Sequence, residues 1–127
     1  MEQESLVEVI CDTSFLIHFA TKKIRNIDTL GTEIGKLSFA VPLVVLNELQ
    51  RLQTISKKKH DAAVTLDFIQ SFRLVPITGN FADKELINYV KKNNSIIGTM
   101  DKNLKKNIKE NGGSVLSFSN DRIVLES

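Results

Sequence analysis

The stretch from Val7 to Ser14 constrains the fold more than any other part of the chain. A short apolar run rich in β-branched side chains predicts a buried strand over residues 7–11, and this strand ends abruptly in Asp12 and two hydroxyl residues. An apolar segment at residues 15–20 follows, with a helix start signal in front of it. A buried strand that brings an acid to its carboxyl end, beside a helix N-terminus, is how open α/β sheets present chemistry to a crevice.

Strand and helix patterns alternate along the rest of the chain. Apolar runs predict strands at 39–41, 73–77, 95–99, 115–118 and 123–125, and three- and four-residue spacing predicts helices at 24–37, 43–54, 62–72, 82–92 and 102–110. Pro76 indicates that the strand containing it is short or near an edge. This order predicts an α/β fold, a three-layer sandwich with a central, mostly parallel five-stranded sheet. Because no linker or internal repeat interrupts the chain, we expect a single domain over 1–127.

Composition narrows the class of protein. With 127 residues, 42% of them apolar and 25% charged, the chain has the make-up of one globular domain. No apolar run reaches the length of a membrane span, and residues 1–5 carry no secretory signal, so we expect no membrane partner. The single cysteine, Cys11, excludes an internal disulfide and favours a cytoplasmic location. His18 and His60, without a second cysteine, exclude the usual zinc cage, and they are expected to be structural or exposed.

Three further acids stand where they can join Asp12. Asp101 repeats the strand–acid–helix junction, Asp83 falls in the first turn of a predicted helix, and Glu48 projects from the edge of an apolar helix face. Each acid also has an ordinary structural explanation. Asp12 and Asp101 could be helix N-caps, Asp83 could complement a helix dipole, and Glu48 could turn to solvent. Together, however, they can converge at the carboxyl edge of one parallel sheet.

Four carboxylates gathered in this way need a counter-charge. At separations of about 7 Å they would repel by roughly 2 kcal/mol per pair at an effective dielectric near 20, so six pairs sum to the order of a domain's whole stability. Such a cluster needs protons or a divalent cation. All-oxygen ligation selects Mg²⁺ or Mn²⁺, ions that commonly act on phosphate esters.

Four short motifs carry a family resemblance that covers nearly the whole chain. The ordered set Ile10–Ser14, Val45–Leu49, Ala82–Asp83 and Gly98–Lys102 resembles the PIN domain family. The resemblance implies a Mg²⁺- or Mn²⁺-dependent endoribonuclease in which metal-bound water hydrolyses RNA phosphodiesters. It implies that the catalytic and metal-binding residues are Asp12, Glu48, Asp83 and Asp101, and that the supporting polar residues are Ser14 and Thr99.

Two departures from the family pattern leave a second hypothesis open. Many members carry a further acid where this chain has Lys84, and some carry one where it has Asn103. The alternative is therefore a weak or inactive PIN-like module that binds RNA or a protein partner. A phospho-aspartate enzyme or receiver domain is a distant third, because Ser14 stands where one such class has a second Asp and Thr13 follows Asp12 where the other has an acid pair.

Lysines supply the cations that RNA needs beside an acidic site. We expect RNA contacts from Lys57, Lys58, Lys59, Lys102 and Lys105. Ordinary solvated surfaces explain each of these lysines as well. No aromatic stacking platform is expected, because Phe15 and Phe19 are assigned to the core, so the sequence favours contacts with the RNA backbone. The resemblance further implies an antitoxin or a ribosome-biogenesis partner (the toxin and ribosomal RNA-processing roles), and a possible homodimer.

Overall fold

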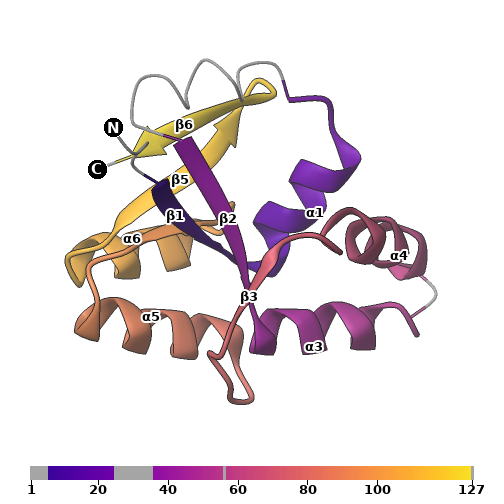
Figure 1. The fold of residues 1–127 in the computed structure, drawn as a ribbon, viewed down its shortest axis with the longest axis horizontal. Coiled ribbons are helices and arrows are strands. Elements are labelled where there is room, and N and C mark those ends of the chain that lie inside the picture. The colour runs from indigo at the N-terminus through magenta and orange to yellow at the C-terminus, as the bar shows by residue number, and fades with distance from the viewer. Residues whose placement is uncertain (1–5, 25–35, 56, 127) are drawn as a thin grey trace, which may run out of the picture.

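The computed structural model describes residues 6–24, 36–55 and 57–126 (Figure 1). The strands are β1 (Leu6–Cys11), β2 (Lys36–Pro42), β3 (Arg73–Val75), β4 (Ile96–Gly98), β5 (Ser114–Ser119) and β6 (Arg122–Glu126). The helices are α1 (Thr13–Thr21), α3 (Leu43–Leu52), α4 (Lys59–Phe68), α5 (Ala82–Lys92) and α6 (Lys102–Glu110). Among the described residues, no helix is long and apolar enough to cross a bilayer.

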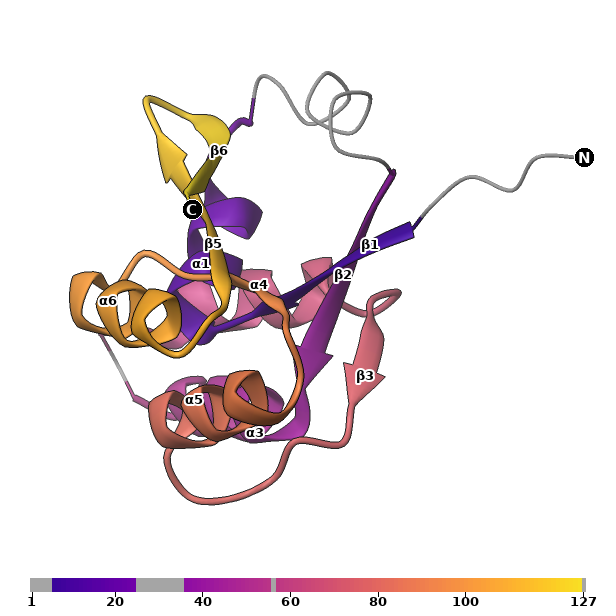
Figure 2. The same ribbon diagram turned by 90° about the vertical axis from the view of Figure 1, so that its left-hand side faces the viewer.

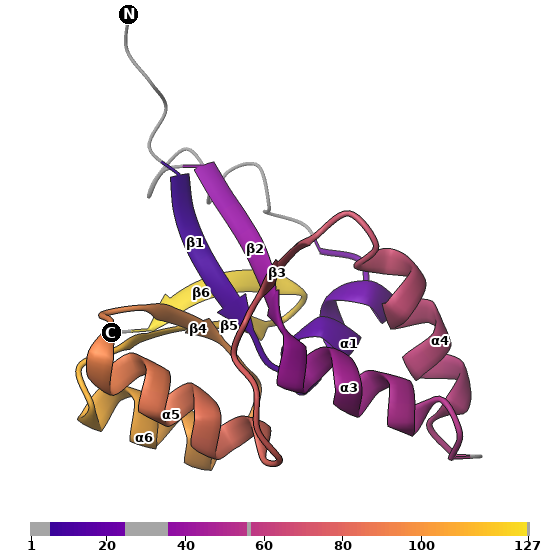
Figure 3. The same ribbon diagram turned by 60° about the horizontal axis from the view of Figure 1, so that its bottom comes forward.

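The strands form one sheet in the order β3-β2-β1-β4-β5-β6, in which only the β5–β6 pair is antiparallel. The chain winds outward from β1 through β2 to β3, then returns to β4 on the other side of β1. Right-handed crossovers therefore put α1, α3 and α4 on one face and α5 and α6 on the other, as Figure 3 shows. The expected α/β fold with a mostly parallel sheet is confirmed. The winding reverses between β1 and β4, which makes their carboxyl ends the natural position for a site.

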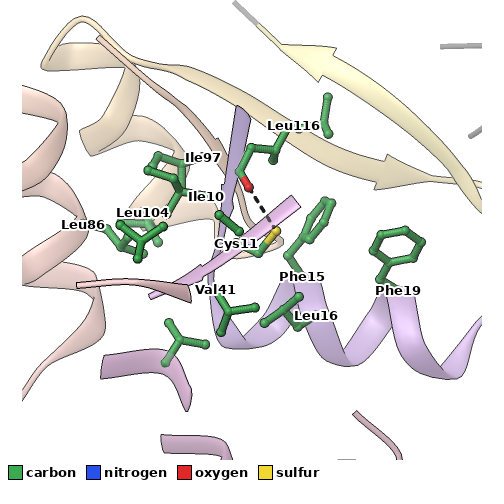
Figure 4. Packing of buried hydrophobic residues seen from close by; sticks show 14 of the residues in the cluster. Ile10, Cys11, Phe15, Leu16, Phe19, Val41, Leu86, Ile97, Leu104 and Leu116 are labelled. Atoms are coloured by element: carbon green, nitrogen blue, oxygen red, sulfur yellow. Dashed lines mark hydrogen bonds between the residues drawn. The ribbon is translucent and has the colours of Figure 1, made fainter. Parts of the chain in front are cut away.

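Both faces of β1 are buried, and this requires helices on both sides of the sheet. Successive side chains of a strand point to opposite faces. Ile10 groups with Leu86 and Leu104 of the α5–α6 layer, whereas Cys11 lies toward Phe15 on α1 (Figure 4). Each of these five side chains is at most 1% exposed. The core therefore fixes the end of β1, and with it Asp12, from two directions.

Two local predictions need correction. Leu37, which we assigned to the inner face of a helix over 24–37, lies in β2 opposite Val7 of β1, and the rest of that predicted helix falls mainly outside the described residues. The helix predicted at 62–72 is α4, which begins earlier, at Lys59, and ends at Phe68. Periodicity placed both boundaries incorrectly because sheet pairing and turn formation override it at the ends of elements.

The sheet has six strands where we expected five, because the strand predicted at 123–125 joins it as β6, antiparallel to β5. Asn120 and Asp121 both adopt positive φ, 52° and 61°, as a two-residue type I′ hairpin turn requires. This turn folds β6 back onto β5 at one edge, while the three-residue β3 forms the opposite edge (Figure 2). The prediction that the strand before Pro76 is short and near an edge is confirmed.

The carboxylate of Glu126 ties β6 to helix α6. It accepts hydrogen bonds from Ser117 Oγ at 2.5 Å and from Lys105 Nζ and Lys109 Nζ at 3.0 Å each. The Ser117 hydrogen bond, followed by the bonds from the two lysines, lowers the pKa of Glu126 to about 2. The stabilisation is therefore complete above the ordinary glutamate pKa and is lost as the pH falls toward 2.

We expect Glu126→Gln to lower the free energy of unfolding by about 1 kcal/mol at pH 7, after solvent screening is allowed for. Urea unfolding curves of the two chains should converge as the pH falls toward 2, because Glu126 is then protonated in the native chain as well. An equal difference at pH 7 and pH 2 would show that the charged interaction is not its source.

Candidate active site

Asp12 directly follows the carboxyl end of β1 and is the one buried carboxylate among the residues that the structure describes. Its backbone N–H donates to the carbonyl of Gly98 on β4 (2.9 Å), which continues the β1–β4 ladder one residue further. Its Oδ1 accepts from the N–H of Phe15 (2.9 Å), so Asp12 is the N-cap of α1. The side chain is buried, at 5% exposure. Asp12 therefore caps helix α1 and at the same time lies at the carboxyl edge of the sheet.

Two hydroxyl groups join the ends of β1 and β4 through Asp12. Thr99 Oγ1 donates to Asp12 Oδ2 (2.5 Å) and accepts from the N–H of Asp101 (3.0 Å). Ser14 Oγ donates to Asp12 Oδ1 (2.9 Å) and accepts from the N–H of Met100 (3.0 Å). Each hydroxyl group thus donates its one proton to the carboxylate and accepts a hydrogen bond from a backbone N–H that follows β4. The structure places Ser14 and Thr99 where they hold Asp12 in position.

Asp101 and Asp83 stand on neighbouring helix starts at the same edge of the sheet. Asp101 is the N-cap of α6, and its Oδ1 accepts from the N–H of Leu104 at 3.0 Å. Asp83 lies in the first turn of α5. Both carboxylates are exposed, in contrast to Asp12, so they face solvent across the crevice.

Electrostatic coupling connects the four acids that the sequence singled out. Burial is the main cause that raises the pKa of Asp12 to about 6, against the lowering effect of its hydrogen bonds, and the charge of Asp83 raises it further. The pKa of Asp83 is itself raised, first because neighbouring atoms partly shield its carboxyl group from water, although the residue is exposed overall, and then by the charges of Asp101 and Glu48. Asp83 therefore lies close enough to Asp12, Glu48 and Asp101 to interact with the charge of each.

The donor set suits a hard divalent cation, although it is not a ready-made cage. Within residues 6–24, 36–55 and 57–126, no three His, Cys, Asp or Glu side chains are grouped tightly enough to hold an ion as they stand. Mg²⁺ is usually held by one or two carboxylates with several waters and substrate phosphates, so a closed cage is not required. An all-oxygen donor set, in which the pKa values of Asp12 and Asp83 are raised, fits that mode of binding. Asp12, Asp83, Asp101 and Glu48 would hold the ion.

A large cleft of about 880 Å³ opens beside Asp12, between α1, α3 and α4. Of the candidate site residues, Ser14 and Glu48 line it, and its other lining residues include Lys58, His60 and Asp61. Two buried side-chain atoms in its wall, Thr13 Oγ1 and His18 Nε2, have no hydrogen-bond partner within the described part of the chain. Its volume falls in the range of sites that take a small ligand or a nucleotide.

The candidate RNA-binding lysines differ in their surroundings. Lys57, Lys58, Lys59 and Lys102 are exposed, so they are available to a phosphate backbone. Lys105 has an exposed fraction of only 20% in its side chain and is paired with Glu126, which leaves it less free for RNA. This pairing between α6 and β6 could not be predicted from the sequence, so the expectation for Lys105 rested on helix periodicity alone.

A second, smaller cleft of about 210 Å³ lies on the other side of Glu48. Its polar lining consists of Asn47, Glu48, Arg51 and Asn80. Sequence reasoning missed Arg51 and Asn80. Arg51 follows Glu48 by three residues, a spacing that puts two helical residues on one face, and this signal could have identified it.

The fold and the site define an α/β domain with an acidic crevice at the switch point of a parallel sheet. A family model described as a PIN like domain matches residues 9–120, and the chain belongs to the PIN domain family. It is 32% identical over 118 residues to Ribonuclease VapC4 from Methanocaldococcus jannaschii, covering 87% of this chain and 89% of that protein. A solved structure described as the PIN domain endonuclease Utp24 superposes with a TM-score of 0.77 at 27% identity, covering 94% of this chain and 90% of that one.

The raised pKa of Asp12 predicts a stability cost for the native acid in the absence of metal. Its pKa of about 6 in the folded chain lies above the ordinary aspartate value of 3.8, so the native state loses stability as the pH rises through that interval. In EDTA at pH 8, we expect Asp12→Asn to raise the free energy of unfolding by about 2 kcal/mol, with a smaller gain at pH 4. Thermal unfolding at both pH values measures this, and a variant less stable than the native chain at pH 8 would contradict it.

Proposed function

We propose that the protein is a Mg²⁺- or Mn²⁺-dependent endoribonuclease that hydrolyses RNA phosphodiesters at the crevice between β1 and β4. The single observation that carries this proposal is geometric: Thr99 bonds both to Asp12 after β1 and to the backbone of Asp101 after β4, and Asp83 lies in the first turn of α5. Family membership and the two nuclease relatives support the reaction class.

Each acid has a distinct proposed task. Asp12, locked by Ser14 and Thr99, provides a fixed carboxylate against which the ion is positioned. Asp101 and Asp83, on the first turns of α6 and α5, hold the ion from the exposed side, and Glu48 does so from α3. The bound ion supplies neutralisation of the charge that develops on the phosphate and activation of the attacking water.

The surrounding cations compensate for the repulsion between an acidic pit and RNA. Lys58 and His60 line the large cleft, so we propose that the RNA strand enters along it and reaches the acids past Ser14. Lys84 and Asn103 replace acids that other family members carry, so four carboxylates are the complete set here. An antitoxin or ribosome-biogenesis partner, a homodimer and a cytoplasmic location stay predictions.

We expect Asp12→Asn to reduce cleavage of a single-stranded RNA by at least about 100-fold in Mn²⁺, since it removes a charge from the fixed side of the site. Gel analysis of a labelled RNA measures the rate. Glu110→Gln, an exposed acid at the far end of α6, is the matched control and should cleave at the native rate. Cleavage by highly purified Asp12→Asn at the native rate would refute the proposal.

Divalent ions provide a test that does not depend on turnover. Mn²⁺ should raise the melting temperature of the native chain and of Glu110→Gln, because binding to the folded state stabilises it by mass action. The increase should be much smaller for Asp12→Asn. If RNA binds but no ion binds and no cleavage occurs, the inactive-module alternative is the better description.

Lys58 and Lys105 should respond differently to substitution. Lys58→Gln should weaken RNA binding. It should also reduce the slope of log K against log salt by the amount that corresponds to about one phosphate contact. Lys105→Gln should instead lower thermal stability, because its ammonium group is bonded to Glu126. Fluorescence anisotropy and thermal melting separate the two effects, and the opposite pattern would show that the cleft is not the RNA path.

A further inference from the structure

The small cleft beside Glu48 is bounded by two segments that the structure ties together. The N–H of Val44 at the start of α3 donates to the carbonyl of Ile77 (2.9 Å), which fixes the connection leading into α5 against α3. Gly79 has φ of +134°, and a Cβ there would lie 2.4 Å from a carboxylate oxygen of Glu85. The turn at Gly79–Asn80 therefore requires glycine at position 79, because of its positive φ, and the Glu85 side chain packs against that glycine. Figure 1 shows this connection dipping between the start of α3 and the start of α5.

The chemistry of the small cleft suits a phosphodiester group. At about 210 Å³ it is smaller than a typical small-molecule site of about 300–1,000 Å³, so it has room for a group and not for a whole ligand. Three of its lining side chains, Asn47, Arg51 and Asn80, carry N–H donors, and Glu48 is its one acid. A guanidinium with amide donors beside it is a preferred arrangement for phosphate oxygens. No carboxylate partner of Arg51 occurs in the described part of the chain, although Glu48 lines the same cleft.

Phe81 is exposed immediately next to this cleft. The other six phenylalanines all pack against another aromatic ring, whereas Phe81 makes no ring contact within residues 6–24, 36–55 and 57–126 and is 70% exposed. It follows Asn80 directly and precedes Asp83 by two residues. We expected no aromatic stacking platform because Phe15 and Phe19 belong to the core, and Phe81 is an exposed ring that this reasoning did not consider. An exposed ring beside phosphate-binding groups is how single-stranded nucleic acids are held without sequence readout.

We infer that the small cleft and Phe81 form a second RNA subsite, in which Arg51, Asn47 and Asn80 bind a backbone phosphate and Phe81 stacks on a neighbouring base. The inference rests on the proposed nuclease function and extends it. Glu48 lines both clefts, so one strand passes from the large cleft over the carboxylates into the small one. Arg51 and Phe81 bind the RNA strand beyond the scissile bond. Their contacts offset the repulsion between the RNA and the carboxylates, and neither side chain takes part in the reaction.

Binding of a short fluorescein-labelled single-stranded RNA, measured by anisotropy on an Asp12→Asn background in Mg²⁺, tests the inference without cleavage. Phe81→Ala should weaken binding by about tenfold, and Phe81→Tyr should bind within about twofold of the background because its ring still stacks. Arg51→Gln should weaken binding and reduce the slope of log K against log salt by about 0.7, the value for one phosphate on a single strand.

Two matched controls remove similar groups away from the subsite. Leu6→Ala removes an exposed apolar side chain at the opposite end of β1 from Asp12, and Lys92→Gln removes a cation at the far end of α5 from Asp83. Both should bind as the background does, with an unchanged salt slope. Equal affinity of Phe81→Ala and the background, failure of Phe81→Tyr to retain binding, or an unchanged slope in Arg51→Gln would each overturn the inference.

Cleavage of the same RNA by the chain with native Asp12 separates the two claims. Cleavage that is insensitive to Phe81→Ala and Arg51→Gln at subsaturating RNA leaves the nuclease function in place and removes the subsite. No cleavage, together with the expected binding pattern, removes the nuclease function and leaves an RNA-binding surface. Where both hold, the variants should raise KM and leave kcat within about twofold, because they bind the substrate and do not act on it.

Discussion

The hydrogen bond from Thr99 to Asp12 is the interaction on which the site depends. It joins residues 87 positions apart in the sequence and links the two strands between which the winding of the sheet reverses. Ser14 closes the same network from the other side of the carboxylate. Both carboxylate oxygens of Asp12 accept hydrogen bonds in this network. An acid that is buried and has a raised pKa can therefore be held at the carboxyl edge of the sheet. If Asp12 has the role that we propose, the requirement for this acid opposes the stability of the fold.

The arrangement also shows that structural and functional explanations of an acid do not exclude each other. Asp12 and Asp101 are N-caps, and Asp83 occupies the first turn of a helix, as their positions in the sequence suggested on purely structural grounds. Capping orients each carboxylate at the carboxyl edge of the sheet. In a parallel α/β sheet, the same helix starts that need acids for their N–H groups surround the crevice, so local stability and the grouping of charge share one geometric cause.

Much of this could be read from the sequence, for identifiable reasons. The apolar run before Asp12 and its repeat before Asp101 fixed the two central strands, because local patterning is strongest where both faces of a strand are buried. Lys105 and Phe81 could not be placed in this way. The pairing of Lys105 with Glu126 needs the β5–β6 hairpin, and the exposure of Phe81 depends on how the Gly79 turn seats against α3. Both depend on contacts between elements distant in the sequence.

The central claim is that Asp12, Glu48, Asp83 and Asp101 serve one divalent ion. The most direct measurement is the anomalous scattering of Mn²⁺ soaked into crystals of the native chain. A peak about 2.1 Å from an oxygen of Asp12, with at least one of the other three carboxylates coordinated directly or through water, is the predicted result. An ordered Mn²⁺ elsewhere, with none at Asp12 at saturating concentration, would contradict the claim.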